Sequence, residues 1–305
     1  MLKCEEINYK GYKAVALTTS QVELVVSVAF GPRILSFRTL PDGINFLKNF
    51  EDQLADFKKD EWQSYGGHRL WFAPEVYPDT YYPDVDEVEY CFDEDAQKLV
   101  LICEPESKSK LAKEFTIEIE GEKLVKIQQR VTNCGDEAIT FAPWSLTVMA
   151  AGGRLVVPQE KFVPHGEKEG ESFLPARPLV LWKFTDMSDP RFTFGKNFVQ
   201  LRQDDNYPTK QKIGMCNTLG YSLYTLNNQT MVKYFDYQEG VTYPDMGCNC
   251  EFFTMPGFLE MEALGPMETV PAGKSVILSE MWEILDYPLP EDDAEIAEAI
   301  ANAIG

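Results

Sequence analysis

The sequence predicts an all-β fold of antiparallel strands, with one short helix at the C-terminal end. Two observations carry this expectation. Short runs rich in β-branched, aromatic and alternating apolar residues recur along the whole chain, and turn residues separate them. The pattern also lacks a regular alternation of strands and helices, which argues against a parallel α/β sheet. At 305 residues, the chain has a length that a large β-sandwich can reach.

The predicted strands follow one another along most of the chain. The clearest is 115–120, where apolar and polar side chains alternate between two faces before a turn at Gly121. We expect this run to form a hairpin with 124–132. The other runs assigned to strands are 22–28, 33–37, 99–103, 138–141, 155–157, 198–201, 221–226, 231–237, 251–254, 258–264 and 276–284.

Helical signals are few and local. Residues 51–63 are compatible with a short helix, and the acidic run 291–293 leads into 294–304 as acidic residues do at helix N-termini. We expect this last helix to pack on the sheet. No Gly-, Ser- or Pro-rich linker, low-complexity tract or fixed-period repeat divides the sequence, so residues 1–305 are predicted to form one domain.

Composition narrows the class of partner. Hydrophobic residues make up 44% of the chain and aromatic residues 12%, enough for a sizeable core. Acidic residues outnumber basic ones by 49 to 28, giving a formal charge of -21, and such a surface repels phosphate backbones and anionic lipids. We therefore expect no nucleic acid and no membrane partner. A neutral small-molecule or oligosaccharide ligand meets no such repulsion, and the oligomeric state stays open.

The first residues and the cysteines bear on location and cofactors. Residues 1–6 hold no basic segment followed by an apolar stretch, which predicts a cytoplasmic protein. Seven scattered cysteines do not suggest a disulfide framework, and the close pair Cys248 and Cys250 lacks the spacing of a zinc site. The sequence also lacks phosphate-cradling, dinucleotide-binding and hydrolase-elbow motifs. We therefore expect no metal and no cofactor.

The segment 62–84 combines residue types that suit a sugar subsite. Two glycines permit a turn or a close backbone approach, His68 can exchange a proton near neutral pH, and Arg69 donates forked hydrogen bonds. Trp71 and Tyr82 offer faces for the C–H side of a pyranose. The alternative is a long loop stiffened by aromatics and prolines, with His68 hydrogen-bonded inside it. We expect a cleft built around residues 66–71.

A second polar cluster lies near the C-terminal end. In an extended strand Glu260 and Glu262 point to one face, and two close carboxylates raise one pKa in a way that suits a general acid or base. Asp245, Asn249 and Glu251 precede them and are predicted to extend the same ligand surface. The alternative for this acidic chain is an outward face of solvated carboxylates.

Five stretches resemble the galactose mutarotase-like superfamily, which includes the aldose 1-epimerases. They are Phe30-Gly31-Pro32-Arg33-Ile34-Leu35-Ser36-Phe37, the pair Gly66-Gly67 with Trp71 and Pro74, the stretch from Val131 through Ser145 to Gly152-Gly153, Leu259-Glu260, and Val270-Pro271-Ala272-Gly273-Lys274. The full pattern looks closer to an uncharacterised bacterial branch than to a proven epimerase. The resemblance implies a large two-layer antiparallel sandwich, the galactose mutarotase-like supersandwich, with a sugar on its concave face. It also implies that Glu260 is the general base.

One departure from the superfamily bears on the reaction. The epimerases carry a histidine general acid in the central strand pair, and the matching place here holds Trp144-Ser145-Leu146. Mutarotation needs a base for the anomeric hydroxyl and an acid for the ring oxygen. We expect His68 to supply the acid and pair with Glu260. Trp144 would instead be a stacking platform, which favours binding.

Three functions remain open from the sequence. The first is a carbohydrate-active enzyme, an aldose epimerase or related sugar isomerase, that acts on a neutral sugar with Glu260 and His68 and holds it with Arg69 and Trp71. The second is a carbohydrate-binding protein without turnover. The third is a subunit whose acidic surface and aromatic residues meet a protein partner, which would present a wide flat aromatic patch rather than a cleft.

Overall fold

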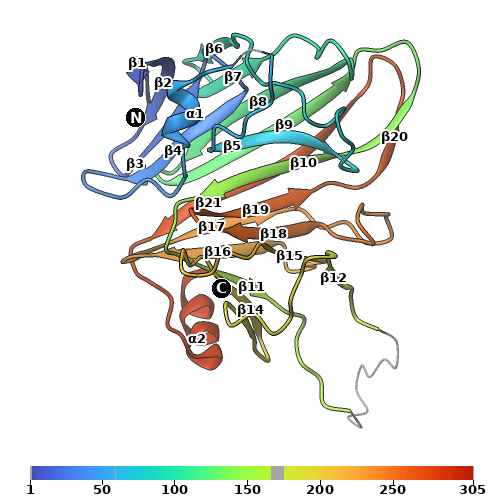
Figure 1. The fold of residues 1–305 in the computed structure, drawn as a ribbon. Helices are drawn as coiled ribbons and strands as arrows, with labels where there is room; N and C mark the ends of the chain where they lie inside the picture. Colours follow the sequence, from blue (N-terminus) through green and yellow to red (C-terminus); the bar gives the residue numbers. More distant parts are fainter. Residues whose placement is uncertain (1, 59, 166–174, 305) are drawn as a thin grey trace.

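The computed structural model describes residues 2–58, 60–165 and 175–304, and two large antiparallel sheets account for most of them (Figure 1). In spatial order, the described strands of the first sheet are β1 (Lys3–Tyr9), β2 (Tyr12–Thr18), β3 (Val22–Ser27), β4 (Arg33–Thr39), β5 (His68–Ala73), β10 (Ile139–Met149), β19 (Phe258–Leu264), β18 (Cys250–Met255), β15 (Gln211–Met215) and β12 (Leu179–Leu181). A short further strand, β20 (Glu268–Val270), pairs with β10.

The second sheet is built mainly from the middle and the end of the chain. Its described strands, again in spatial order, are β13 (Phe192–Phe194), β14 (Phe198–Arg202), β11 (Arg154–Pro158), β16 (Tyr221–Leu226), β17 (Gln229–Phe235), β21 (Ser275–Leu285), β9 (Leu124–Asn133), β8 (Leu111–Glu120), β7 (Lys98–Ile102) and β6 (Glu89–Asp93). The fold class predicted from the sequence is confirmed.

The predicted hairpin joins β8 to β9. Phe115 lies opposite Gln129 and Ile117 lies opposite Ile127, in a register that runs the full length of both strands. Phe115 and Ile117 are fully buried, whereas the alternate residues of β8 are partly exposed. Period-two alternation therefore gave both the strand and its buried face.

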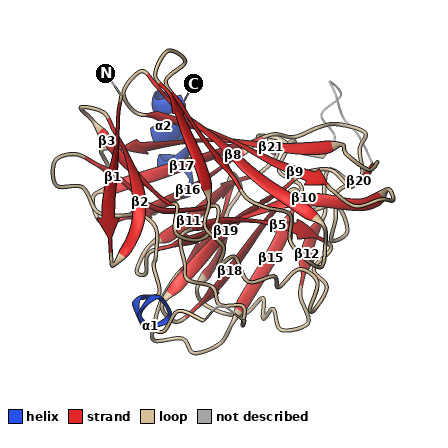
Figure 2. Ribbon diagram, turned by 90° about the horizontal axis from the view of Figure 1, so that it is seen from above, coloured by secondary structure: helices blue, strands red, loops and turns tan. Residues whose placement is uncertain are grey.

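The main core lies between the two sheets, whose strands overlap when viewed from above (Figure 2). Leu24 of β3 and Met261 of β19 contribute from the first sheet, and Phe115 of β8 and Trp282 of β21 from the second. Each sheet turns one set of alternate side chains toward the other sheet. The opposite set on the first sheet is therefore available to form a binding surface.

The sequence predicted the bounds of the C-terminal helix well and those of the first helix poorly. The helix expected in 51–63 is only α1 (Glu51–Ala55), whose one buried side chain is Leu54. The C-terminal helix is confirmed as α2 (Asp293–Ile304), and its Ile296 and Ile300 pack on the outer face of the second sheet. Within the described part of the chain, no helix is long and apolar enough to cross a membrane.

The segment expected to be a glycine-pair loop is half loop and half strand. Gly66 and Gly67 have positive φ angles of 80° and 71°, and a Cβ on Gly66 would lie 2.1 Å from the carbonyl oxygen of Lys48. Only glycine permits this close approach. Arg33 of β4 donates hydrogen bonds to the carbonyls of Ser64 (2.8 Å) and Gly66 (2.6 Å). His68, the residue after Gly67, begins β5, which pairs with β4 on one side and with β10 on the other.

Candidate functional site

A cleft lies on the face of the first sheet that points away from the second sheet, over β5, β10, β19, β18 and β15, which are neighbours in Figure 1. Its volume is about 480 Å³, within the usual range for small-ligand pockets. The lining residues are Trp62, Ser64, Arg69, Trp71, Glu75, Tyr81, Trp144, Leu146, Trp182, Phe184, Lys210, Lys212, Phe253, Met255, Phe258, Glu260 and Glu262. Nearly half of these residues are aromatic.

Strand register brings the key side chains of the cleft together. Arg69 of β5 lies opposite Leu146 of β10, which also lies opposite Glu262 of β19, and Glu262 in turn lies opposite Glu251 of β18. These residues form one row across four strands and share a face of the sheet. Gly214 of β15 ends the row, and a Cβ there would come within 2.6 Å of Cys248 Sγ and 3.1 Å of the Trp182 ring, so a side chain would displace these neighbours.

His68 faces the opposite way from the cleft, which corrects the expected acid–base pair. It precedes Arg69 on β5, so its side chain enters the core between the sheets, where it is fully buried. One ring nitrogen lies 2.9 Å from Thr147 Oγ1 and the other 3.0 Å from Gln129 Oε1. Burial lowers the pKa of His68 to about 3, so it is neutral at physiological pH. With Glu260 on the cleft face, the two cannot flank one sugar ring.

Three other residues expected to bind substrate also lie outside the cleft. Tyr82 borders a separate small cavity beside Asp84 and does not join the cleft wall. Asn249 is fully buried and accepts a 2.6 Å hydrogen bond from the backbone N–H of Asn217, so it stabilises a turn. Asp245 has a φ of 47° in the loop before β18 and does not line the cleft. Of the three, Asn249 has a structural role, and Tyr82 and Asp245 lie away from the cleft wall.

Glu260 is held by the one arginine of the cleft. Arg69 Nη2 donates to Glu260 Oε1 over 3.2 Å, and the guanidinium carbon lies 4.7 Å from the centre of the Trp71 ring and 5.7 Å from that of Trp62. The guanidinium therefore makes cation–π contacts with two neighbouring indoles, the nearer being Trp71. The pair places a carboxyl group next to a cation at the edge of the cleft, where Glu260 is 9% exposed.

Lys212 lines the cleft and was not among the residues predicted from the sequence. Its Nζ lies 2.6 Å from Glu251 Oε2 and 3.2 Å from Glu262 Oε2, over the rings of Trp144 (5.2 Å) and Trp182 (4.6 Å). Glu251 does not line the cleft itself and is linked to the cleft wall by its ion pair with Lys212. Burial raises the pKa of Glu251 well above its usual range and that of Glu262 to about 7, while the Lys212 charge opposes both shifts.

Several cleft residues carry buried polar atoms that have no hydrogen-bond partner among the described residues. They are Nε1 of Trp62, Nε1 of Trp71, Nε and Nη1 of Arg69, and Oε1 of Glu262. Buried polar groups are normally paired, and leaving one unpaired costs about 1–3 kcal/mol. These atoms are donors and acceptors of the kind that sugar hydroxyls satisfy.

Two further buried cations, Arg191 and Lys233, have structural partners. Arg191 binds Asp189 through its Nη2 at 2.8 Å, and Lys233 binds Glu280 at 3.1 Å between the sheets. Neither lines the cleft. In the described ranges, no group of three or more His, Cys, Asp or Glu side chains is arranged to hold a metal ion.

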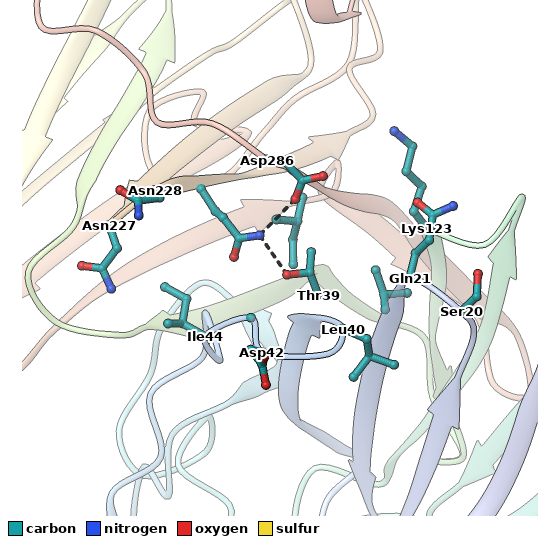
Figure 3. Close-up of a pocket in the computed structure, with 14 residues that line it drawn as sticks. Ser20, Gln21, Thr39, Leu40, Asp42, Ile44, Lys123, Asn227, Asn228 and Asp286 are labelled. Atoms are coloured by element: carbon teal, nitrogen blue, oxygen red, sulfur yellow. Dashed lines mark hydrogen bonds between the residues drawn. The ribbon is translucent and has the colours of Figure 1, made fainter.

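A second cavity, of about 600 Å³, lies between the turns at one end of the sandwich (Figure 3). Gln229 crosses it and donates to Thr39 (2.8 Å) and Asp286 (3.1 Å). Its other polar side chains are mainly amides, hydroxyls and acids, including Asn227 and Asn228. It has no aromatic wall and none of its lining residues is among those with an unpaired buried polar atom. The smaller cleft is the better candidate site.

Comparisons with known proteins bear on the fold. No protein-family model matches the sequence, and no curated protein matches it. Among solved structures, the Slr1438 protein of Synechocystis sp. PCC 6803 is similar over 93% of this chain and 96% of its own, with 11% identity and a TM-score of 0.60. A putative aldose 1-epimerase of Escherichia coli K12 is similar over 93% and 99%, at 11% identity and a TM-score of 0.54.

A third similar structure is a galactose mutarotase-like protein of Lactobacillus casei ATCC 334, which covers 89% of this chain and 100% of its own at 11% identity, with a TM-score of 0.54. At this identity, similarity over nearly the full length establishes the fold and leaves the activity to be argued from the site. The chain has the galactose mutarotase-like fold.

Proposed function

We propose that the protein is a carbohydrate-active enzyme, an aldose epimerase or related sugar isomerase, that binds a neutral sugar in the cleft over β5, β10 and β19. The observation that carries the proposal is the set of unpaired polar atoms on Arg69, Trp71 and Glu262 among aromatic rings. A pyranose has both surfaces that such a site needs, hydroxyls for the polar atoms and C–H faces for the rings.

Charge in the cleft favours a neutral sugar. The positive side chains of Arg69, Lys210 and Lys212 stand among the negative side chains of Glu75, Glu260 and Glu262. Ion pairs join Arg69 to Glu260 and Lys212 to Glu262, so each of these two cations already has a carboxylate partner. The overall formal charge of -21 also disfavours an anionic ligand.

Glu260 is the group best placed to act as the base. It pairs with Arg69, it reaches the cleft surface, and its side chain points to the same side as the aromatic wall. A base here takes the proton of the anomeric hydroxyl, after which the bond from the anomeric carbon to the ring oxygen breaks and the ring opens. Reclosure on the other face of the carbonyl gives the other anomer.

The proposal is tested by exchange NMR on a panel of neutral aldoses, with the full chain added at catalytic concentration. We expect faster exchange between the α and β anomer signals of at least one aldose. Glu260→Gln should remove this acceleration while the sugar still binds. Binding of sugars with no acceleration of exchange for any aldose would overturn the enzymatic part of the proposal.

The second candidate is a carbohydrate-binding protein without turnover. The observation in its favour is the contact of Arg69 with Glu260, because this ion pair occupies the carboxylate that the reaction needs. Under this alternative Glu260→Gln changes affinity only slightly, and the wild-type chain accelerates no anomer exchange. A protein-interaction subunit would present a flat aromatic patch. The aromatic residues of the described cleft line a pocket instead.

A further inference from the structure

Three carboxyl groups in and behind the cleft share two cations. Arg69 pairs with Glu260, and the ammonium of Lys212 lies between Glu251 and Glu262. Glu251 and Glu262 are each only 1% exposed. One ammonium cannot balance two carboxylates that water barely reaches, so the Glu251–Glu262 pair retains a proton.

We propose that Glu262 is the proton donor of the cleft and delivers this shared proton to the ring oxygen of the sugar while Glu260 takes the proton of the anomeric hydroxyl. The inference rests on the proposed function, since a proton donor has a role only if the ring opens. It gives the acid role to a second carboxyl group on β19 in place of His68.

The spacing of the two carboxyl groups fits this division. Residues i and i+2 of a strand point to one face and stand about 7 Å apart. The hydroxyl oxygen and the ring oxygen of an aldose are bonded to the same carbon, so two carboxyl groups at this separation can each reach one of them. Glu260 and Glu262 both line the cleft and have this relationship.

The two oxygens of Glu262 differ in their contacts. Trp144 Nε1 donates to Glu262 Oε2 over 2.9 Å, and Lys212 Nζ lies 3.2 Å from the same oxygen. Glu262 Oε1 has no partner among the described residues. Two donors fix Oε2, which also sets the orientation of Oε1, and Oε1 makes no hydrogen bond of its own. Trp144 therefore positions the acid in addition to offering a ring face.

The proton transfers balance without another reactant. On opening, Glu260 gains the hydroxyl proton, the carbon–ring oxygen bond breaks, and the ring oxygen gains the proton of Glu262. On reclosure the new hydroxyl regains a proton from Glu260, and Glu262 recovers its proton as the ring oxygen bonds to carbon. Both carboxyl groups return to their starting states.

The surroundings of Glu262 set the pH at which it can donate. The charged and titratable groups that face it are Glu260 on its own strand, Glu251 on β18, Lys212 on β15, Arg69 on β5 and, through the sheet, Lys233 on β17. Burial raises the pKa of Glu262 to about 7 against the opposing charge of Lys212. A donor must start protonated, so the rate is expected to fall as pH rises through this range.

The test is the rate of anomer exchange as a function of pH for the wild-type chain and for Glu262→Gln, Glu251→Gln and Glu118→Gln. We expect Glu262→Gln to bind the sugar, to lose about 10²–10⁴-fold in rate and to lose the alkaline limb of the profile. In Glu251→Gln, Glu262 is the remaining carboxyl partner of Lys212 in this pair, which lowers the pKa of Glu262. The alkaline limb should therefore move to lower pH. Glu118, half-exposed on β8, is the control and should change neither rate nor profile.

The outcomes separate the two proposals. A wild-type chain that accelerates no anomer exchange overturns the proposed function and this inference together. A wild-type chain that is active, with a folded Glu262→Gln variant that keeps its rate and alkaline limb, overturns this inference alone. If Glu262→Gln does not fold, the Glu251→Gln profile decides, because an unmoved alkaline limb contradicts the shared proton.

Discussion

His68 and Arg69 are adjacent in the chain, yet their side chains leave β5 on opposite faces of the first sheet. His68 is enclosed between the sheets with Thr147 and Gln129, and Arg69 stacks on Trp71 in the cleft. One peptide unit thus separates a residue of the core from a residue of the site. Our proposal therefore gives the chemistry expected of the histidine to carboxyl groups on β19.

Replacing His68 should damage stability and leave the cleft intact. His68→Ala leaves a cavity beside Trp282 and removes both hydrogen bonds of the ring, so we expect the free energy of unfolding to drop by about 2–4 kcal/mol. Anomer exchange per folded molecule should be unchanged. Urea unfolding and exchange NMR measure the two effects. A His68→Ala variant that is as stable as the wild type but inactive would contradict this prediction and indicate that His68 takes part in the reaction.

The ion pair of Lys233 with Glu280 should be costly to break on one side only. Both groups are buried between the sheets, and Glu280→Gln leaves the lysine charge without its partner, so we expect a loss of about 3–5 kcal/mol in unfolding free energy. Replacing both residues by apolar ones should recover much of it. The half-exposed pair of Lys98 with Glu118 is the control, with an expected loss of about 0–1 kcal/mol. Equal losses for the two pairs would contradict the structure.

The raised pKa of Glu262 should also appear in stability. The folded chain holds this proton up to about pH 7, whereas the unfolded chain releases it near 4.5, so the folded state binds more protons in between. Stability should therefore fall as pH rises from 4.5 to 7, relative to a Glu262→Gln variant that lacks the titrating group. Urea unfolding of both proteins at several pH values gives this difference. A difference that rises with pH would mean a lowered pKa.

Trp182 should contribute to sugar affinity from the rim of the cleft. It is half-buried just after β12 and lies over the Lys212 ammonium. Trp182→Ala removes a ring face for the sugar and uncovers the lysine, so we expect about a tenfold weaker Kd by calorimetry, equal to about 1.4 kcal/mol. Trp182→Phe should keep most of the affinity. An unchanged Kd for the alanine variant would place the sugar away from this rim.

The fold was largely predictable because its strands alternate clearly. The runs 115–120, 221–226 and 258–264 match β8, β16 and β19 closely, and Glu260 and Glu262 were given one face from alternation alone. β5 was missed because the glycine pair before it and the prolines after it resemble a loop. Treating 68–73 as a strand would have sent His68 and Arg69 to opposite faces from the sequence itself.

The missing part of the site depends on which strands are neighbours. Lys212 stands in the five-residue strand β15, and its segment carries no motif; it becomes significant only because β15 pairs with β18, which brings it to Glu251. Local pattern cannot give a pairing between strands so far apart in sequence. Trp144 was singled out from resemblance, but its hydrogen bond to Glu262 required the register of β10 on β19.

The most direct test of sugar binding in this cleft uses the five tryptophans as reporters. Trp62, Trp71, Trp144 and Trp182 line the cleft, whereas Trp282 is buried in the core with its Nε1 bonded to Glu280. In ¹⁵N NMR of the full chain titrated with neutral sugars, we expect the indole N–H signals of Trp62 and Trp71 to shift most and that of Trp282 to stay fixed. Indole signals that remain unmoved with every sugar would contradict the proposed site.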